Sequence, residues 1–229
     1  LFSYPIAVFL NILGMMILSK FVEIRPNTVP IPSEIREYFM GLIIIALAPG
    51  ICEEAMFRGM ILSSYDRLGR RKAIIYSAIL FGLFHFNLQN LLGPIYLGVL
   101  FGIITYRTNS LIPTIIGHTM NNSIALTLGY FLTKGELNME MSMNIHDIIS
   151  DIEIMRVMLS MSLFIIIFAF IVYRLIRLLP EGSIRQEFVT SRKDINQNFN
   201  ATKRLNIIEI LPILIVIIIF IVLNYRYLF

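Results

Sequence analysis

Residues 39–63 read FMGLIIIALAPGICEEAMFRGMILS, an apolar run that contains two carboxylates and a guanidinium. The run is longer than the roughly 20 residues that a helix needs to span about 30 Å of hydrocarbon. An ionisable side chain at mid-bilayer costs about 2.5–3.5 kcal/mol on insertion scales, so a chain retains one there when it is paired or functional. Glu53, Glu54 and Arg58 therefore make this segment both a predicted membrane helix and a candidate site.

The rest of the chain has the same apolar character. Of 229 residues, 57% are hydrophobic and 15% are charged, and the mean hydropathy is +0.77; ordinary soluble domains have roughly 45–50% apolar and 25% charged residues. This excludes an ordinary soluble enzyme and predicts an all-α, polytopic transmembrane helical bundle forming one membrane domain over 1–229. We place about seven spans, near residues 1–22, 39–63, 72–90, 91–107, 110–132, 157–179 and 207–229. Gly93 and Pro94 are expected to break the helix between the third and fourth spans.

The net charge of +4 does not indicate a nucleic-acid partner, because the Lys and Arg residues cluster between the apolar blocks. Twelve of them follow the second, fourth and sixth spans, and six lie on the opposite side. By the positive-inside rule the first set is cytoplasmic and Phe229 is external, as in a multi-pass protein of a prokaryotic plasma membrane. The first set is Arg67, Arg70, Arg71, Lys72, Arg107, Arg174, Arg177, Arg185, Arg192, Lys193, Lys203 and Arg204; the second is Lys20, Arg25, Arg36, Lys134, Arg156 and Arg226. Because the chain opens with Leu1 and not Met, we expect N-terminal material to be missing.

Two connections are long and polar, 133–156 and 180–206, and neither is predicted to form a separate domain. The first contains a possible interfacial helix near Ile145–Met155 and a histidine, His146, expected to be a solvated loop residue. The single cysteine, Cys52, excludes an internal disulfide, and without a basic neighbour it is predicted to be a packing residue.

Helix spacing separates the two glutamates of the second span. Glu54 and Arg58 stand at i and i+4, which predicts a side-chain pair on one face. Glu53 is turned about 100° away and needs a partner from another helix. Pro49 frees a backbone carbonyl one turn earlier, so water can enter where the hydrogen-bond ladder is broken.

Histidines lie in two other predicted spans. Ala78, Gly82 and His85 share one face of the third span, so we expect His85 to point inward on a stripe of small residues. In the fifth span, His118 and Asn122 are at i and i+4 and are expected to be directed at one neighbouring helix, with no role for the adjacent Asn121.

In the fourth span, Gly98 and Gly102 form a GxxxG face that can approach these helices closely, although this motif is weak evidence by itself.

The polar groups also agree in depth. From the cytoplasmic end of each span, a rise of about 1.5 Å per residue places Glu53 at about 15 Å, His85 at about 20 Å, and His118 and Asn122 at about 12 and 18 Å. These four side chains therefore predict one intramembrane polar cavity that opens toward the cytoplasm.

These residues form three motifs, Glu53-Glu54-x-x-x-Arg58, Phe81-x-x-x-His85 and His118-x-x-x-Asn122. In this set and order the chain resembles the CPBP glutamate intramembrane proteases (CAAX protease and bacteriocin-processing, or Abi, family), which include the type II CAAX prenyl endopeptidases. The resemblance covers a catalytic core of about residues 40–132 and says little about the C-terminal spans 157–179 and 207–229.

The resemblance implies an intramembrane endopeptidase that hydrolyses a peptide bond of a membrane-tethered substrate, and lipidated and CAAX-like peptides are among the candidates. By the family's pattern Glu53 activates water, His85 orients that water or moves a proton, and His118 with Asn122 stabilises the oxyanion. Glu54 and Arg58 give structural support. A carboxylate that is taken out of water suits the role of general base, and donors to the oxyanion are most effective in a site from which water is excluded.

The residues alone leave alternatives open for both the mechanism and the function. Glu53, His85 and His118 are residue types of a three-ligand zinc site; because the His-Glu-x-x-His signature is absent, we favour a metal-free mechanism with no cofactor. A transporter would use the same buried groups, but the inverted repeats common in transporters are not evident. A non-cleaving bacteriocin-immunity or scaffold protein is also compatible. A prenylated C-terminal motif, a bacteriocin precursor and a signalling membrane protein all remain possible substrates, and the oligomeric state is not predicted.

Overall fold

The computed structural model describes residues 2–22, 24, 31–134, 151–180 and 207–225, and all regular structure within them is helical. For these residues the prediction of an all-α fold is confirmed. The predictions for His146, for most of the Ile145–Met155 segment and for nearly all of 180–206 lie outside the described residues.

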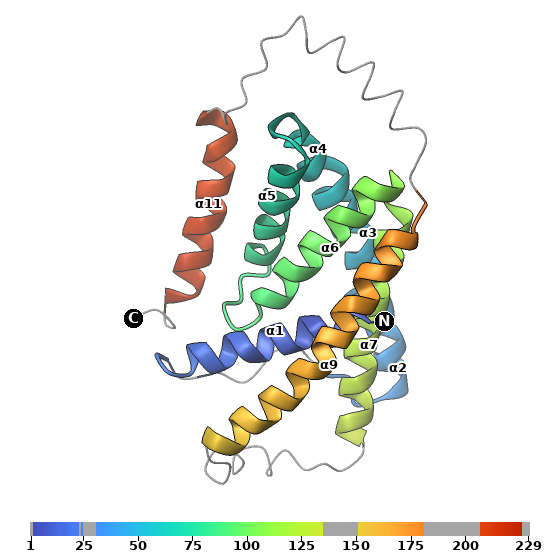
Figure 1. Cartoon of the computed structure of the whole chain (residues 1–229), viewed down its shortest axis with the longest axis vertical. Coiled ribbons are helices and arrows are strands. Elements are labelled where there is room, and N and C mark those ends of the chain that lie inside the picture. Colours follow the sequence, from blue (N-terminus) through green and yellow to red (C-terminus); the bar gives the residue numbers. More distant parts are fainter. Residues whose placement is uncertain (1, 23, 25–30, 135–150, 181–206, 226–229) are drawn as a thin grey trace, which may run out of the picture.

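Each of the seven predicted apolar segments contains a helix (Figure 1). The second is continuous from residue 35 to 64, with π-helical stretches η1 and η2 on either side of a short α-helical stretch. Its parts are α2 (Ile35–Gly41), η1 (Leu42–Leu47), α3 (Ala48–Glu54), η2 (Ala55–Ile61) and α4 (Leu62–Ser64), and the 3₁₀ turn η3 (Asp66–Leu68) follows. The others are α1 (Ser3–Leu18), α5 (Arg70–Leu83), α6 (Leu92–Thr108), α7 (Ile112–Lys134), α9 (Asp151–Leu178) and α11 (Ile207–Leu223).

The boundary between the third and fourth helices differs from the prediction. α5 ends at Leu83 and α6 begins at Leu92, so residues 84–91 form a loop where the sequence predicted helix to residue 90. Gly93 and Pro94 do not break a helix; they lie in the first turn of α6. Proline is tolerated there because the first N–H groups of a helix have no intrahelical acceptor.

Among the residues that the structure describes, two helices are long and apolar enough to cross a membrane by length and composition: Ile35–Ser64 and Met158–Leu178. Three shorter apolar helices in the same part of the chain are Ser3–Leu18, Leu92–Thr108 and Ile210–Leu223. No residue in the most apolar window of Met158–Leu178 is buried, and Leu159 and Leu163 are 72% and 63% exposed. A contiguous apolar surface of this kind is unfavourable in water and marks contact with lipid or protein.

The long helix 35–64 packs antiparallel along α7. A Cβ atom at Gly41 would lie 2.9 Å from a methyl group of Leu126, and one at Gly50 would overlap the Thr119 hydroxyl. Near its start, the ring of Tyr38 stacks on Tyr130 at 4.8 Å. Because Gly41 and Gly50 have no side chain, the two helices approach closely enough for their polar groups to meet.

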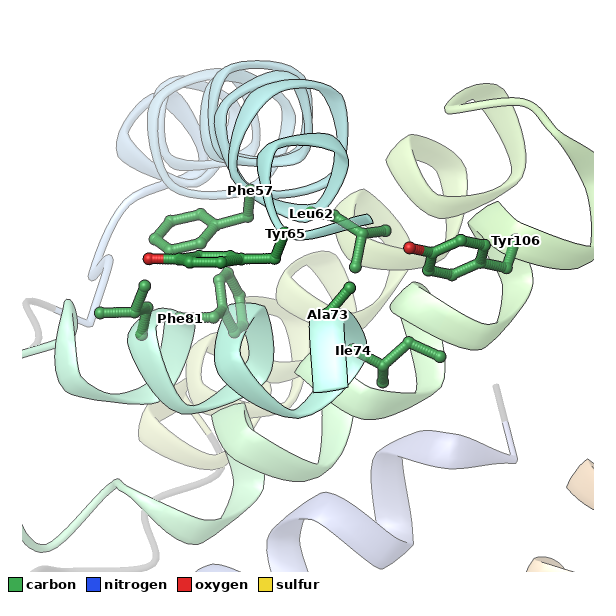
Figure 2. Packing of buried hydrophobic residues seen from close by; sticks show 8 residues of the cluster. Phe57, Leu62, Tyr65, Ala73, Ile74, Phe81 and Tyr106 are labelled. Atoms are coloured by element: carbon green, nitrogen blue, oxygen red, sulfur yellow. The ribbon is translucent and has the colours of Figure 1, made fainter. Parts of the chain in front are cut away.

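α5 packs between α6 and the end of the long helix. A Cβ atom at Gly98 would lie 2.7 Å from the Ala78 Cα atom, which confirms close packing by the predicted glycine face. On the other side, the Ser77 hydroxyl donates to the Phe57 carbonyl at 3.0 Å. Figure 2 shows the apolar cluster between these helices, in which Phe57 faces Phe81. This cluster forms one wall of the site.

Candidate functional site

The site is built around α3, which carries both glutamates between the two π-helical stretches. π-Helical stretches widen the turn and are common at functional sites. Because Pro49 has no N–H, the Ile45 carbonyl lacks the donor that an α-helix would provide. The Asn122 side chain donates to this carbonyl at 3.1 Å. A polar group of α7 thus compensates the break.

Glu54 is the buried centre of a three-residue network. Its side chain is 0% exposed, and Oε1 accepts hydrogen bonds from Arg58 Nη1 at 2.8 Å and from His118 Nδ1 at 2.9 Å. The predicted pairing of Glu54 with Arg58 is confirmed. The bond to His118 was not predicted, and it ties α7 to α3 as well as fixing one ring nitrogen of the histidine.

Glu53 is more exposed than Glu54, and its nearest charged partner is farther away. Its side chain is 32% exposed, and its Oε2 lies 4.0 Å from His118 Nε2. The partner that the sequence required from another helix is therefore His118. The imidazole stands between the two carboxylates, with Nδ1 toward Glu54 and Nε2 toward Glu53.

Two phenylalanines enclose the histidine and the arginine. The Phe81 ring meets His118 edge to face at 5.7 Å and lies 4.4 Å from the Arg58 guanidinium carbon. Phe101 of α6 stacks on His118 at 5.9 Å. Gly117 leaves room for this ring, since a Cβ atom there would lie 3.1 Å from Phe101. Aromatic rings exclude water and attract a nearby cation. The electrostatic interactions within the Glu54 network are therefore stronger than they would be in water.

Phe81 belongs to one of the three sequence motifs, but no function was predicted for it. Phe101 was not predicted as a residue of the site. For Phe81 the signal was the i, i+4 spacing to His85. For Phe101 it was the position between the two glycines of the α6 face.

His85 is placed differently from the prediction. It lies two residues beyond the end of α5, its side chain is exposed, and its Nδ1 donates to the Phe81 carbonyl at 2.9 Å. The expectation of an inward position on the Ala78–Gly82 stripe is wrong, because the helix ends before the next turn. The Phe81 ring links His85 to the site, since it contacts His85 at 5.0 Å and also His118.

Asn122 and His118 are both directed at the long helix, as their i, i+4 spacing predicted. Asn121, for which no role was expected, donates to the Asn122 side-chain oxygen at 3.4 Å. Cys52 is exposed, so its prediction as a packing residue is wrong; it lies on the outer face of α3.

The zinc alternative requires three ligands at one point. In the part of the chain that the structure describes, no group of three His, Cys, Asp or Glu side chains is close enough to hold a metal ion. Glu53 and His118 are near each other, whereas His85 lies beyond the end of its helix. The residues as placed here do not fit a three-ligand zinc site.

Comparison with known protein families identified part of the chain. Residues 35–124 match the family described as type II CAAX prenyl endopeptidase Rce1-like, which confirms the resemblance seen in the three motifs. The matched residues run from the start of α2 into α7 and include Glu53, His85, His118 and Asn122. No curated protein and no solved structure matches the chain.

Proposed function

We propose, from the Rce1-like character of residues 35–124, that this chain is an intramembrane endopeptidase that hydrolyses a peptide bond of a membrane-associated substrate. The family match implies a peptidase of the CAAX type and a membrane protein. The reaction, the residues that perform it and the substrate are our proposal. A lipidated or CAAX-like C-terminal peptide tethered to the bilayer is the proposed substrate class, and we propose no nucleic-acid partner.

The observation that carries the assignment is the contrast between the adjacent glutamates. Glu54 is fully buried, and its Oε1 is engaged by both Arg58 and His118. Glu53 is 32% exposed and faces His118 across 4.0 Å, so water and substrate can reach it. A general base must be within reach of the proton that it removes, and of the two glutamates only Glu53 meets that condition.

The proposed reaction balances without a cofactor. Glu53 removes a proton from a water molecule, and the hydroxide adds to the scissile carbonyl to give a tetrahedral oxyanion. When the carbon–nitrogen bond breaks, the leaving amine takes the proton held on Glu53. The products are a carboxylic acid and an amine, and the water has been consumed.

His118 and Asn122 are the proposed donors to the oxyanion. Asn122 Nδ2 carries two hydrogens, and Ile45 accepts one, so one is left for the substrate. When His118 Nδ1 donates to Glu54, Nε2 can donate only if the ring carries its second proton. The proposed oxyanion role therefore requires the doubly protonated imidazole between the two carboxylates. His85 is proposed to assist the attacking water.

For location, we propose a multi-pass integral membrane protein of a prokaryotic plasma membrane with its polar cavity open to the cytoplasm. The support is the excess of Lys and Arg on one side, twelve against six, and the exposed apolar surface of Met158–Leu178. We propose a bundle with seven spans because each of the seven predicted apolar segments contains a helix.

Glu53→Gln in purified protein in liposomes tests the assignment, with a farnesylated CAAX peptide as probe. We expect a loss of turnover of about 10²- to 10⁴-fold, because the general base is removed while the shape is retained. Cys52→Ser is the matched control at the adjacent exposed position and should cleave as the wild type does. Wild-type turnover by the Glu53→Gln protein would refute the mechanism and favour a different base.

The metal question needs a separate measurement. We expect turnover of the same probe to be unchanged after dialysis against EDTA, because every proposed step uses side chains of the chain. Loss of turnover on chelation with recovery on adding Zn²⁺ would establish the zinc-dependent alternative.

A further inference from the structure

The loop 84–91, which carries His85, is held by the first and last helices of the described chain. Neither α1 nor α11 lies in the Rce1-like segment 35–124. α11 packs beside α5 (Figure 1), where Ile213 and Val216 contact the apolar cluster on the long helix and α5. The position of this catalytic-motif loop thus depends on elements outside the matched segment.

Asn224, directly after α11, holds the centre of the loop. Its Oδ1 accepts a hydrogen bond from Leu88 N at 3.0 Å, and its Nδ2 donates to the Phe86 carbonyl at 3.2 Å. Nδ2 also donates to the Phe220 carbonyl at 2.8 Å, which fixes the side chain to its own helix. Asn224 is only 1% exposed. A buried amide with its donors and acceptor all satisfied is a rigid connection.

The loop needs such a connection because its backbone is strained next to the histidine. Phe86 has φ 48°, in the left-handed region that residues other than glycine rarely adopt. Such a conformation costs on the order of 1–3 kcal/mol and persists only where surrounding contacts enforce it. The two Asn224 bonds are made at Phe86 and two residues later at Leu88, so they enforce this turn at the residue that follows His85.

The far end of the loop is fixed by α1. Asn11 accepts a hydrogen bond from Gly93 N at 2.7 Å through Oδ1 and donates to the Asn90 side chain through Nδ2. A Cβ atom at Gly93 would lie 2.9 Å from the Ala7 carbonyl oxygen, so the glycine is required for this approach.

We propose that Asn224 is a positioning residue for His85, and that α11 serves the reaction by carrying Asn224. The inference rests on the proposed function, since it assigns His85 a part in the reaction. Asn224 does not touch the substrate; it holds the backbone turn from which the imidazole projects. Asn11 supports the same loop from the opposite end.

The test is a double-mutant cycle with the farnesylated CAAX peptide in liposomes. We expect Asn224→Ala to lower kcat by about 10- to 100-fold with KM within about twofold, because a displacement of about 1 Å can cost about 10²-fold. In a His85→Ala background the same substitution should lower kcat by less than about twofold, since the group that it positions is absent. Equal loss in both backgrounds, or no loss in the wild-type background, would overturn the proposal.

Ile218→Ala is the matched control, because it removes an apolar side chain from α11 at a position that is 58% exposed. It should keep its kcat.

Hydrogen–deuterium exchange of residues 84–91 is a readout that does not depend on the substrate. Asn224→Ala should speed this exchange and Ile218→Ala should not, and unchanged exchange in Asn224→Ala contradicts the proposal. If Asn224→Ala does not fold, Asn224→Ser, too short to bond Leu88 and Phe86 together, is judged by the same criteria. Wild-type turnover in Glu53→Gln would instead refute the proposed function, independently of the exchange result.

Discussion

The buried pair between Glu54 and Arg58 should be the most stability-sensitive feature of the site. The two side chains are 0% and 1% exposed and 2.8 Å apart. Within the described residues, Arg58 Nε and Nη2 and Glu54 Oε2 are buried without a hydrogen-bond partner. Removing one member leaves an uncompensated charge, which costs about 3–5 kcal/mol, whereas removing both charges is often nearly neutral.

We therefore expect Arg58→Leu and Glu54→Gln each to lower the free energy of unfolding by about 3–5 kcal/mol. The double variant should lose less than either single one. Gln at position 54 can still accept the His118 hydrogen bond at its side-chain oxygen, and Leu at position 58 still fills the space beside Phe81. The order of stabilities, with the double variant above both single variants, is the specific expectation.

The assay is SDS-induced unfolding in mixed micelles, followed by far-UV circular dichroism. Arg36→Leu, at an exposed position of the same long helix, is the control and should change stability by less than about 0.5 kcal/mol. Single losses below about 1 kcal/mol would show that the pair behaves as a solvated surface pair. A double variant that loses the sum of the single losses would show that the two charges do not depend on each other, and would refute the reasoning.

Two further predictions concern the packing of the helices around the site. Asn122→Leu should lower the free energy of unfolding by about 1–3 kcal/mol, because it leaves the partly buried Ile45 carbonyl without its donor. The loss should be smaller in a Pro49→Ala background, where residue 49 regains an N–H, and equal loss in both backgrounds would contradict this account. Gly98→Leu should lower the free energy of unfolding by about 1–3 kcal/mol or more, because the new side chain would meet the backbone of α5. Gly59→Ala is the control and should be nearly neutral, since the nearest contact of the added Cβ atom is at 3.5 Å. Comparable melting temperatures for these two variants would argue against close packing of α5 on α6.

Much of the fold followed from apolar periodicity and length. All seven predicted segments contain helices, because blocks of about 20 apolar residues bounded by charges strongly favour that structure. The error lay at the end of α5, which the prediction extended to residue 90. Hydropathy does not detect an end such as this one, which is set by a left-handed Phe86 and by the bonds from Asn224.

The site was partly predictable for a similar reason. Spacing of i, i+4 is local, so the Glu54–Arg58 pair and the shared direction of His118 and Asn122 could be read from one helix at a time. The bond from His118 to Glu54, the acceptor of Asn122 and the place of Phe101 depend on how separate helices are aligned.

The sequence by itself determined the helical class, the approximate position of each helix and the small set of polar residues that an apolar chain retains only when paired or functional. Only the tertiary structure decided which glutamate is buried and which is accessible, that His118 stands between them, and that His85 lies on a loop held by α1 and α11. The physical reason is that hydropathy and helical period act within one segment. Burial, hydrogen-bond partners and strained turns arise when segments far apart in the chain are packed together.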